Sequence, residues 1–222
     1  MMRSRSGRFV WLAVMGSVWT LGHVAHAQMP GTPTLQNAFS NPGITAALDV
    51  AGLGGASSYA LAAAWAPGSA RFQLSGGVGL QTRTGVPRQT VYGARVNVPV
   101  LGGTSSFGVS AFAGYGGISG STQDTSVVKS LVPVGATLSY RLGVGSGHGV
   151  SIYGSPMYVL VGRGGGAKNV SGFRGALGLD VGITPAIGAT VGVELGKKEP
   201  PSSGRLSGTA FGAAVSYVIG AR

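Results

Sequence analysis

Bulky apolar residues recur at every second position in about ten segments of the chain after residue 42. In the first segment, Gly43–Gly52, the residues Ile44, Ala46, Leu48 and Val50 share one face. The positions between them are mostly Gly, Ala, Ser and Thr. Strict alternation indicates β-strands, and its repetition in segments of about ten residues is typical of transmembrane barrels. The pattern predicts an all-β fold, a transmembrane antiparallel up-and-down β-barrel of about ten strands, with eight or twelve strands as alternatives.

The nine later strands are predicted around further sets of aligned apolar positions. The seventh is less regular, because Val150 and Ile152 share one face whereas Tyr153, Met157 and Val159 share the other. The nine segments are Tyr59–Trp65, Phe72–Leu80, Tyr92–Val98, Phe107–Tyr115, Val132–Tyr140, Gly149–Val161, Phe173–Val181, Ile187–Leu195 and Phe211–Ile219.

Aromatic residues stand near the ends of these strands. An aromatic ring prefers the headgroup level of a bilayer, so this distribution indicates interfacial girdles, although aromatic residues are enriched in strands generally. The residues concerned are Tyr59, Trp65, Phe72, Tyr92, Phe107, Tyr115, Tyr140, Phe173, Phe211 and Tyr217.

The connections between strands are predicted to alternate in length. Short connections are predicted after the second, fourth, sixth and eighth strands. Longer connections are predicted after the third, fifth, seventh and ninth strands. Outer-membrane barrels have short periplasmic turns and longer extracellular loops. The longer loops are therefore predicted to face outward and both termini to be periplasmic. The polar residues assigned to these loops are Arg83, Arg88, Gln123, Asp124, Arg163, Lys168, Lys197, Lys198 and Arg205.

The N-terminus has the organisation of a secretory signal peptide. Arg3, Arg5 and Arg8 precede an apolar stretch, Phe9–Leu21, and Ala25-His26-Ala27 forms a small-x-small cleavage site. The apolar stretch is shorter than a membrane-spanning helix requires. We predict Sec-type export with cleavage after Ala27. The chain then divides into a signal peptide (1–27), a periplasmic N-terminal lead-in (28–42) and an outer-membrane barrel domain (43–222).

The composition supports a surface that faces lipid. Charged residues make up 9% of the 222 residues, far below the share of about 25% in soluble proteins. Cysteine is absent, which excludes disulfides and a lipid anchor on cysteine. The formal net charge of +11 raises the possibility of a nucleic-acid partner, but the basic residues are scattered singly and form no known binding motif. Attraction to anionic outer-leaflet lipid, including lipopolysaccharide, or to acidic ligands accounts for this charge better, and partial pairing of charges inside a barrel accounts for it best.

The positions between the bulky residues place polar and charged side chains on the predicted inner face. Unpaired charges in a narrow lumen are costly, so ion pairs between arginines and carboxylates are expected. We interpret this set first as a structural polar core and second as a pathway for a small anion. It comprises Asp49, Arg71, Gln73, Arg95, Asn97, Arg141, Arg174, Asp180 and Glu194.

No residue set predicts an enzyme. After the signal peptide the one histidine is His148, which falls in a predicted short turn without a catalytic partner at a recognisable spacing. No cluster of histidines and carboxylates has the spacing of a metal site, and no cofactor is expected.

The Ala25-His26-Ala27 site followed by about ten alternating strands with Gly-rich inner faces resembles the small, porin-like outer-membrane β-barrel proteins of Gram-negative-type bacteria. This resemblance implies outer-membrane localisation, periplasmic chaperones and a barrel-assembly machinery as partners, and a monomer. Such barrels often end in an aromatic residue, whereas this sequence ends Ile219-Gly220-Ala221-Arg222. That departure leaves the strand number and the assembly route open.

Three functions are consistent with the sequence. The first is a non-enzymatic integral outer-membrane barrel with a structural or surface-interaction role. The second is a narrow pore for small anionic or polar solutes. The third is a soluble periplasmic ligand-binding barrel, which would need its bulky residues inside.

Overall fold

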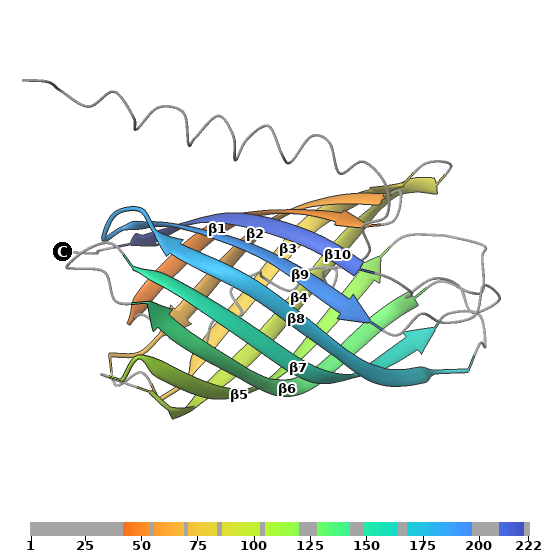
Figure 1. The fold of residues 1–222 in the computed structure, drawn as a ribbon. Coiled ribbons are helices and arrows are strands. Elements are labelled where there is room, and N and C mark those ends of the chain that lie inside the picture. Colours follow the sequence, from red (N-terminus) through yellow and green to blue (C-terminus); the bar gives the residue numbers. More distant parts are fainter. Residues whose placement is uncertain are drawn as a thin grey trace, which may run out of the picture.

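Ten antiparallel strands close into one barrel in the computed structural model (Figure 1). The structure describes residues 42–53, 56–68, 71–83, 86–102, 105–119, 128–142, 149–163, 168–196 and 209–219. The strands are β1 (Gly43–Leu53), β2 (Ala56–Ala66), β3 (Gln73–Arg83), β4 (Val86–Leu101), β5 (Phe107–Ser119), β6 (Val128–Leu142), β7 (Val150–Arg163), β8 (Val170–Gly182), β9 (Ile187–Gly196) and β10 (Thr209–Ile219). The predicted all-β fold and the predicted ten strands are confirmed.

The barrel closes because the first strand pairs with the last. The register between β1 and β10 runs from Ile44↔Ile219 to Gly52↔Phe211, and every other strand pairs with its neighbours in sequence. Closure leaves no strand edge with unpaired backbone groups, which lipid would not tolerate. We call the end where β1 begins and β10 ends the terminal rim, and the opposite end the distal rim.

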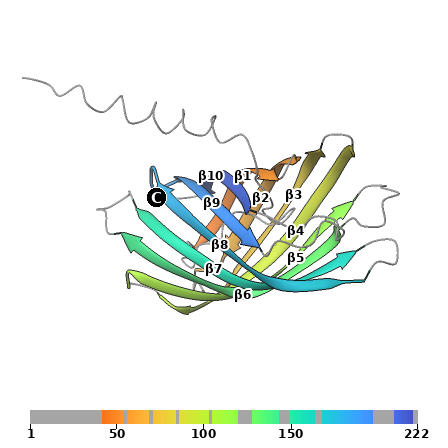
Figure 2. The ribbon, with the colours of Figure 1, turned by 45° about the vertical axis from the view of Figure 1, so that its right-hand side comes forward.

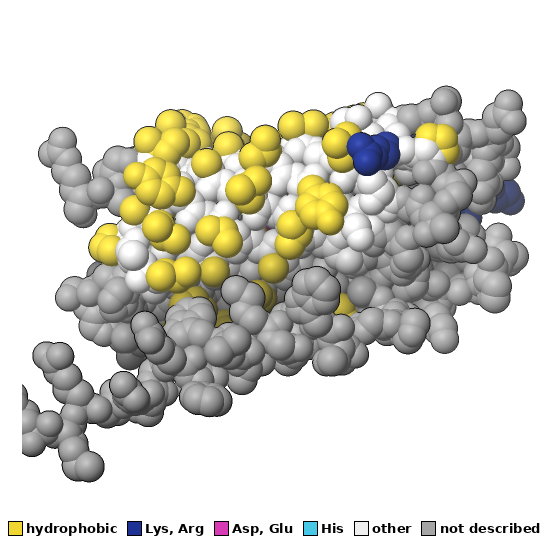
Figure 3. Space-filling view, turned by 90° about the horizontal axis from the view of Figure 1, so that it is seen from above, with side chains coloured by type: hydrophobic (Ala, Val, Ile, Leu, Met, Phe, Trp, Pro, Cys, Tyr) yellow, Lys and Arg dark blue, Asp and Glu magenta, His cyan; other side chains and the backbone are white. Residues whose placement is uncertain are grey.

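The outer surface of the barrel is apolar. Large apolar side chains of all ten strands are exposed, Leu48, Leu61 and Phe173 among them, and hydrophobic side chains spread over the visible face in Figure 3. An apolar surface of this extent would be unstable in water, whereas it matches a bilayer. The alternative of a soluble barrel with its bulky residues inside is therefore wrong. Within the described part of the chain, no helix is long and apolar enough to cross a membrane.

Exposed aromatic side chains lie near both ends of the strands, as the predicted girdles require. Trp65 packs edge-on against Phe72 near the terminal rim, with 5.6 Å between ring centroids. Nearer the distal rim, Phe173 packs in the same way against Tyr158, which was absent from the predicted set, at 5.1 Å. These pairs indicate two interfacial levels with the apolar band between them.

The predicted alternation of loop lengths holds only in part. Residues 84 and 85 alone separate β3 from β4, so the long loop expected there is wrong, and residues 143–149 form a longer β6–β7 connection than expected. The hydrogen-bonded ladder continues past the polar residues Arg83 and Arg88 that the sequence assigned to a loop. Pairing continues to Arg83↔Val86 through a register shift after Gln81. A run of polar residues in the sequence therefore does not mark the end of a strand.

We expect a charge in the middle of the outer surface to destabilise the barrel much more than a charge at its rim. Leu61, in the middle of β2, and Leu101, at the terminal end of β4, are 63% and 60% exposed and so form a matched pair. Leu61→Arg should lower the free energy of unfolding by about 2–4 kcal/mol, and Leu101→Arg by about 0–1 kcal/mol. Denaturant unfolding in phospholipid vesicles measures both values. Equal effects would contradict the placement of lipid around Leu61.

Candidate functional site

The lumen holds most of the predicted inner-face residues. Asp49, Gln73, Arg95, Asn97 and Glu194 are buried there. They come from β1, β3, β4 and β9, and each lies in phase with the small residues of its strand rather than with the exposed apolar ones. The alternation in the sequence therefore assigns these side chains to the inside of the barrel, as expected for a sheet with one face in lipid.

Arg95 is the centre of a hydrogen-bonded network in the lumen. Its Nε donates to Asn97 Oδ1 at 2.7 Å and its Nη2 donates to Thr137 Oγ1 at 3.2 Å. Asn97 Nδ2 in turn donates to Gln73 Oε1 at 3.2 Å. The guanidinium also lies over the ring of Phe112, with Cζ 3.6 Å from the ring centroid. Hydrogen bonds and cation–π attraction together replace the water that a buried guanidinium loses.

The same network covers a gap in the β6–β7 ladder. Pro156 has no backbone N–H, and the register between β6 and β7 skips from Gly135↔Met157 to Leu138↔Gly154. Beside this gap Thr137 Oγ1 and Ser155 Oγ are 2.8 Å apart and share a hydrogen bond. Side-chain hydroxyls therefore join the two strands on the inner face where backbone pairing is interrupted.

An ion pair joins β8 and β9 inside the barrel. Arg174 Nη1 lies 2.8 Å from Glu194 Oε1, and the two side chains are 7% and 3% exposed. Gly196 faces Arg174 across the strands, and a Cβ at that position would lie 2.8 Å from the guanidinium Nε. The glycine therefore provides the space that the arginine occupies. The pairing of arginine with carboxylate that the sequence predicted for the lumen is present at this position.

An apolar cluster that the sequence analysis did not predict lies inside the lumen. Its members are Phe112, Leu131, Met157, Val159, Val161 and Ala176, with Val170 packed against them. The available signal was that bulky residues occupy both faces of β7, because buried Met157 and Val159 alternate with exposed Tyr158 and Leu160. Leu131, Val159 and Val161 lie in the distal halves of β6 and β7. The lumen is therefore polar toward the terminal rim and apolar toward the distal rim on this wall.

The inner face combines large side chains on some strands with small residues on others. In both ribbon views β5, β6 and β7 lie across the barrel from β1, β2 and β10 (Figures 1 and 2). The β1–β2 wall presents small buried residues such as Ala47, Ala62 and Ala64. Tyr153 of β7 lies over Gly178 of β8 and Gly192 of β9, where a Cβ at Gly192 would be 2.9 Å from its hydroxyl. A few large side chains can therefore fill a narrow lumen.

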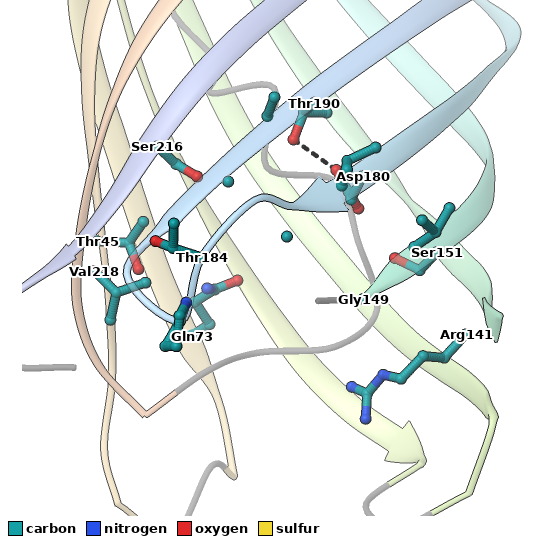
Figure 4. Close-up of a pocket in the computed structure, with 16 residues that line it drawn as sticks. Thr45, Gln73, Arg141, Gly149, Ser151, Asp180, Thr184, Thr190, Ser216 and Val218 are labelled. Atoms are coloured by element: carbon teal, nitrogen blue, oxygen red, sulfur yellow. Dashed lines mark hydrogen bonds between the residues drawn. The ribbon is translucent and has the colours of Figure 1, made fainter. Parts of the chain in front are cut away.

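A cavity of about 350 Å³ lies inside the terminal rim (Figure 4). Asp180 and Arg141 contribute its charges, and Asp180 Oδ1 accepts a hydrogen bond from Thr190 Oγ1 at 2.6 Å. Thr45, Gln73, Ser151, Thr184 and Ser216 add polar groups from other strands and from the β8–β9 connection. This cavity is a polar chamber at the mouth of the barrel.

Two predicted lumen arginines differ from the buried set. Arg71 precedes β3 and is exposed, so its predicted place on the inner face is wrong, because the pleat that would turn it inward begins at Gln73. Arg141 is exposed near the terminal end of β6 and lines the mouth of the cavity.

The residues predicted for the extracellular loops lie at or near the distal rim where the structure describes them. Arg83 and Arg163 end β3 and β7, Arg88 lies within β4, and Lys168 is exposed between β7 and β8. Gln123, Asp124, Lys197, Lys198, Arg205 and also His148 lie outside the described residues. The described part of the chain has no group of three histidines, cysteines or carboxylates that could hold a metal ion.

Comparison with known proteins gives a likeness of shape alone. No family model matches the sequence, and no curated protein matches it. A bacterial polysaccharide outer membrane secretin is similar at a TM-score of 0.46 and 8% identity, over 74% of this chain and 57% of its own. The chain thus spans little more than half the length of that secretin. The KdgM porin, solved with disordered oligogalacturonate, is similar at a TM-score of 0.38 and 11% identity, over 79% of this chain and 98% of its own.

A third similar structure is the outer membrane phospholipase A of Escherichia coli. Its TM-score is 0.32 and its identity 10%, over 84% of this chain and 93% of its own. Likenesses this weak say nothing of activity. The closed antiparallel sheet with its apolar outer surface instead defines the class, and the chain is a transmembrane β-barrel of the outer-membrane type.

We expect the packing of Tyr153 onto Gly178 to be sensitive to a single methyl group. A Cβ at Gly178 would overlap the tyrosine ring, so Gly178→Ala should lower the free energy of unfolding by about 1–3 kcal/mol. Gly172→Ala is the matched control, since Gly172 lies on the same strand and face and a Cβ added there would meet no atom within 4 Å. Its effect should stay within about 0.5 kcal/mol. Equal effects in vesicle unfolding would refute the close packing of Tyr153.

Proposed function

We propose that this protein is a non-enzymatic, non-conducting barrel of the outer membrane with a structural or surface-interaction role. The burial of polar side chains in the middle of the lumen is the observation that supports it. Arg95 is 4% exposed and Thr137 is 0% exposed, although both lie on the inner face. A water-filled channel past these side chains would leave them accessible to water. Barrels of this size have interiors that side chains can largely fill.

The proposed orientation places the distal rim outside the cell and both termini in the periplasm. Lys168 is exposed at the distal rim, and Arg88 is exposed on β4. Basic side chains at that level favour the phosphates of lipopolysaccharide in the outer leaflet. Insertion by the barrel-assembly machinery with periplasmic chaperones, and a monomeric state, complete the proposal.

A narrow pore for small polar or anionic solutes is the second candidate. The cavity of about 350 Å³ at the terminal rim favours it, because that end of the lumen is open and lined by polar groups. The two candidates differ in what lies beyond the cavity. The first requires the Arg95 network and the apolar cluster to stay closed, and the second requires them to open.

We expect the purified, refolded protein to give no stepwise conductance in planar lipid bilayers. Truncation of lumen-filling side chains should then open a passage, so Tyr153→Ala combined with Phe112→Ala should conduct. Tyr158→Ala combined with Phe173→Ala is the matched control, because these two rings face lipid. Stepwise conductance by the unaltered protein would favour the pore over the closed barrel.

We expect single cysteines at the two rims to differ in their accessibility on intact cells. The chain has no native cysteine. Lys168→Cys and Thr184→Cys place one thiol at an exposed position of the distal and the terminal rim respectively. A maleimide too large to cross the outer membrane should label only Lys168→Cys, and both variants should react after lysis. Labelling of Thr184→Cys alone on intact cells would reverse the proposed orientation.

A further inference from the structure

One arginine stands on the outer face of the barrel near the distal rim. Arg88 of β4 is exposed and lies in phase with Thr90 and with Tyr92, whose ring is exposed on the outer surface. Residues two apart on a strand share a face, so Arg88 belongs to the outer face and not to the lumen. A cation on this face is costly next to lipid tails, which neither hydrate it nor neutralise its charge.

A β-bulge positions Arg88 at the distal end of the sheet. The register between β3 and β4 shifts beyond the pair Gln81↔Gln89. There Pro87 and Arg88 of β4 lie opposite the single residue Thr82 of β3. Proline has no N–H to donate to the ladder, and a bulge re-aims the side chains that it carries. The bulge therefore places Arg88 next to Thr82.

No carboxylate of the described chain is placed to neutralise Arg88. The described acidic residues are Asp49, Asp180 and Glu194, and all three lie on the inner face. No hydrogen bond or ion pair joins Arg88 to another described residue. A group outside the described part of the chain is therefore needed to neutralise this arginine.

Hydroxyl groups from four neighbouring strands surround Arg88. Ser57 of β2 pairs with Thr82 of β3, and Thr82 Oγ1 donates to the carbonyl oxygen of Ser57 at 3.4 Å. One outer-face row nearer the middle of the barrel, Thr90 of β4 pairs with Ser119 of β5. Each of these residues lies in phase with the exposed apolar or aromatic residues of its strand. We call these five residues the distal outer patch: Ser57, Thr82, Arg88, Thr90 and Ser119.

The distal outer patch lies at the level of the lipid headgroups. Tyr59 is 60% exposed and stands two residues from Ser57 toward the middle of β2, about 7 Å along the strand. A tyrosine ring marks the membrane interface, and the headgroup region adds about 5–7 Å on each side of the hydrocarbon core. Leu61 and Val78 follow on the outer face and are 63% and 53% exposed. An amphiphile can therefore place its headgroup on the patch and its acyl chains on these apolar residues.

We infer that the distal outer patch binds the phosphorylated sugar headgroup of lipopolysaccharide. Arg88 would hold a phosphate, because the planar fork of a guanidinium fits two phosphate oxygens. The hydroxyls would bond to the sugar. Across β2 to β5 they span three strand spacings, about 14 Å, which is wider than one phosphate can contact. The inference rests on the proposed orientation and deepens the proposed function, since it gives the lipid partner one site and a recognition chemistry.

Binding of lipid A, the acylated and phosphorylated disaccharide of lipopolysaccharide, to the barrel refolded in non-ionic detergent tests this inference. Native mass spectrometry over a lipid titration should show saturable binding of one lipid A per barrel. Dephosphorylated lipid A and phosphatidylglycerol should each bind at least about tenfold more weakly, because the first lacks the phosphates and the second lacks the sugar. Arg88→Gln should weaken lipid A binding about tenfold or more.

Arg71→Gln is the matched control for charge, because Arg71 is also an exposed arginine but lies at the terminal end of β3, away from the patch. It should leave lipid A binding unchanged. The shift of the folded barrel on unheated gels checks that each variant has folded. Absence of saturable lipid A binding, equal binding of either comparison lipid, or equal weakening by the two variants would each overturn the assignment. Detergent exposes both ends of the barrel to lipid, so these outcomes are independent of the orientation, which the cysteine labelling reports.

Discussion

Pairing of β1 with β10 is the constraint on which the rest of the molecule depends. In lipid no water can bond to an unpaired strand edge, so the sheet has to close on itself. Closure at ten strands fixes a narrow interior, and every second residue points into it. The sequence must therefore place apolar side chains on the outer face, against lipid. On the inner face it must fit side chains into a small and partly polar space. The small volume of the interior limits which side chains can lie in the lumen.

The large side chains that fill the lumen come mainly from one part of the barrel wall. Strands β4 to β7 supply the large side chains, Arg95, Phe112, Leu131, Tyr153 and Met157. Strands β1, β2 and β10 have buried alanines, among them Ala47, Ala62 and Ala214, together with the buried Asp49. Arg95 serves both environments, because its guanidinium bonds to the polar groups of Asn97 and Thr137 while its face lies on the Phe112 ring. It thereby joins the polar region to the apolar cluster.

The sequence predicted the outside of the barrel better than the inside. Alternation is a local property with a period of two residues, so it placed Leu48 and Leu61 outward and Asp49 and Arg95 inward without knowledge of their neighbours. It failed for Arg71, where the strand begins two residues later, and for the β3–β4 connection, where pairing continues beyond the apolar band. Contacts within the lumen depend on the register across strands, which the alternation of a single strand does not determine. For that reason the sequence could not predict that Arg141, Ser151 and Asp180 align in one cross-strand row. It could not predict the contact of Tyr153 with Gly178 either.

On the wall formed by β6 and β7 the polarity of the inner face changes from the terminal to the distal rim. Toward the terminal rim the inner face has hydroxyls, amides and opposite charges around a cavity. Toward the distal rim Leu131, Val159 and Val161 of this wall pack together with almost no exposed surface, whereas β8 and β9 place the Arg174–Glu194 ion pair in the same half of the barrel. A polar solute that entered at the terminal rim could exchange its water for protein groups there, but to go further it would have to displace the hydrogen-bonded network of Arg95 and pass the apolar cluster. The side chains in the middle of the lumen therefore oppose passage by their contacts with one another, which is the condition that the proposed closed barrel requires.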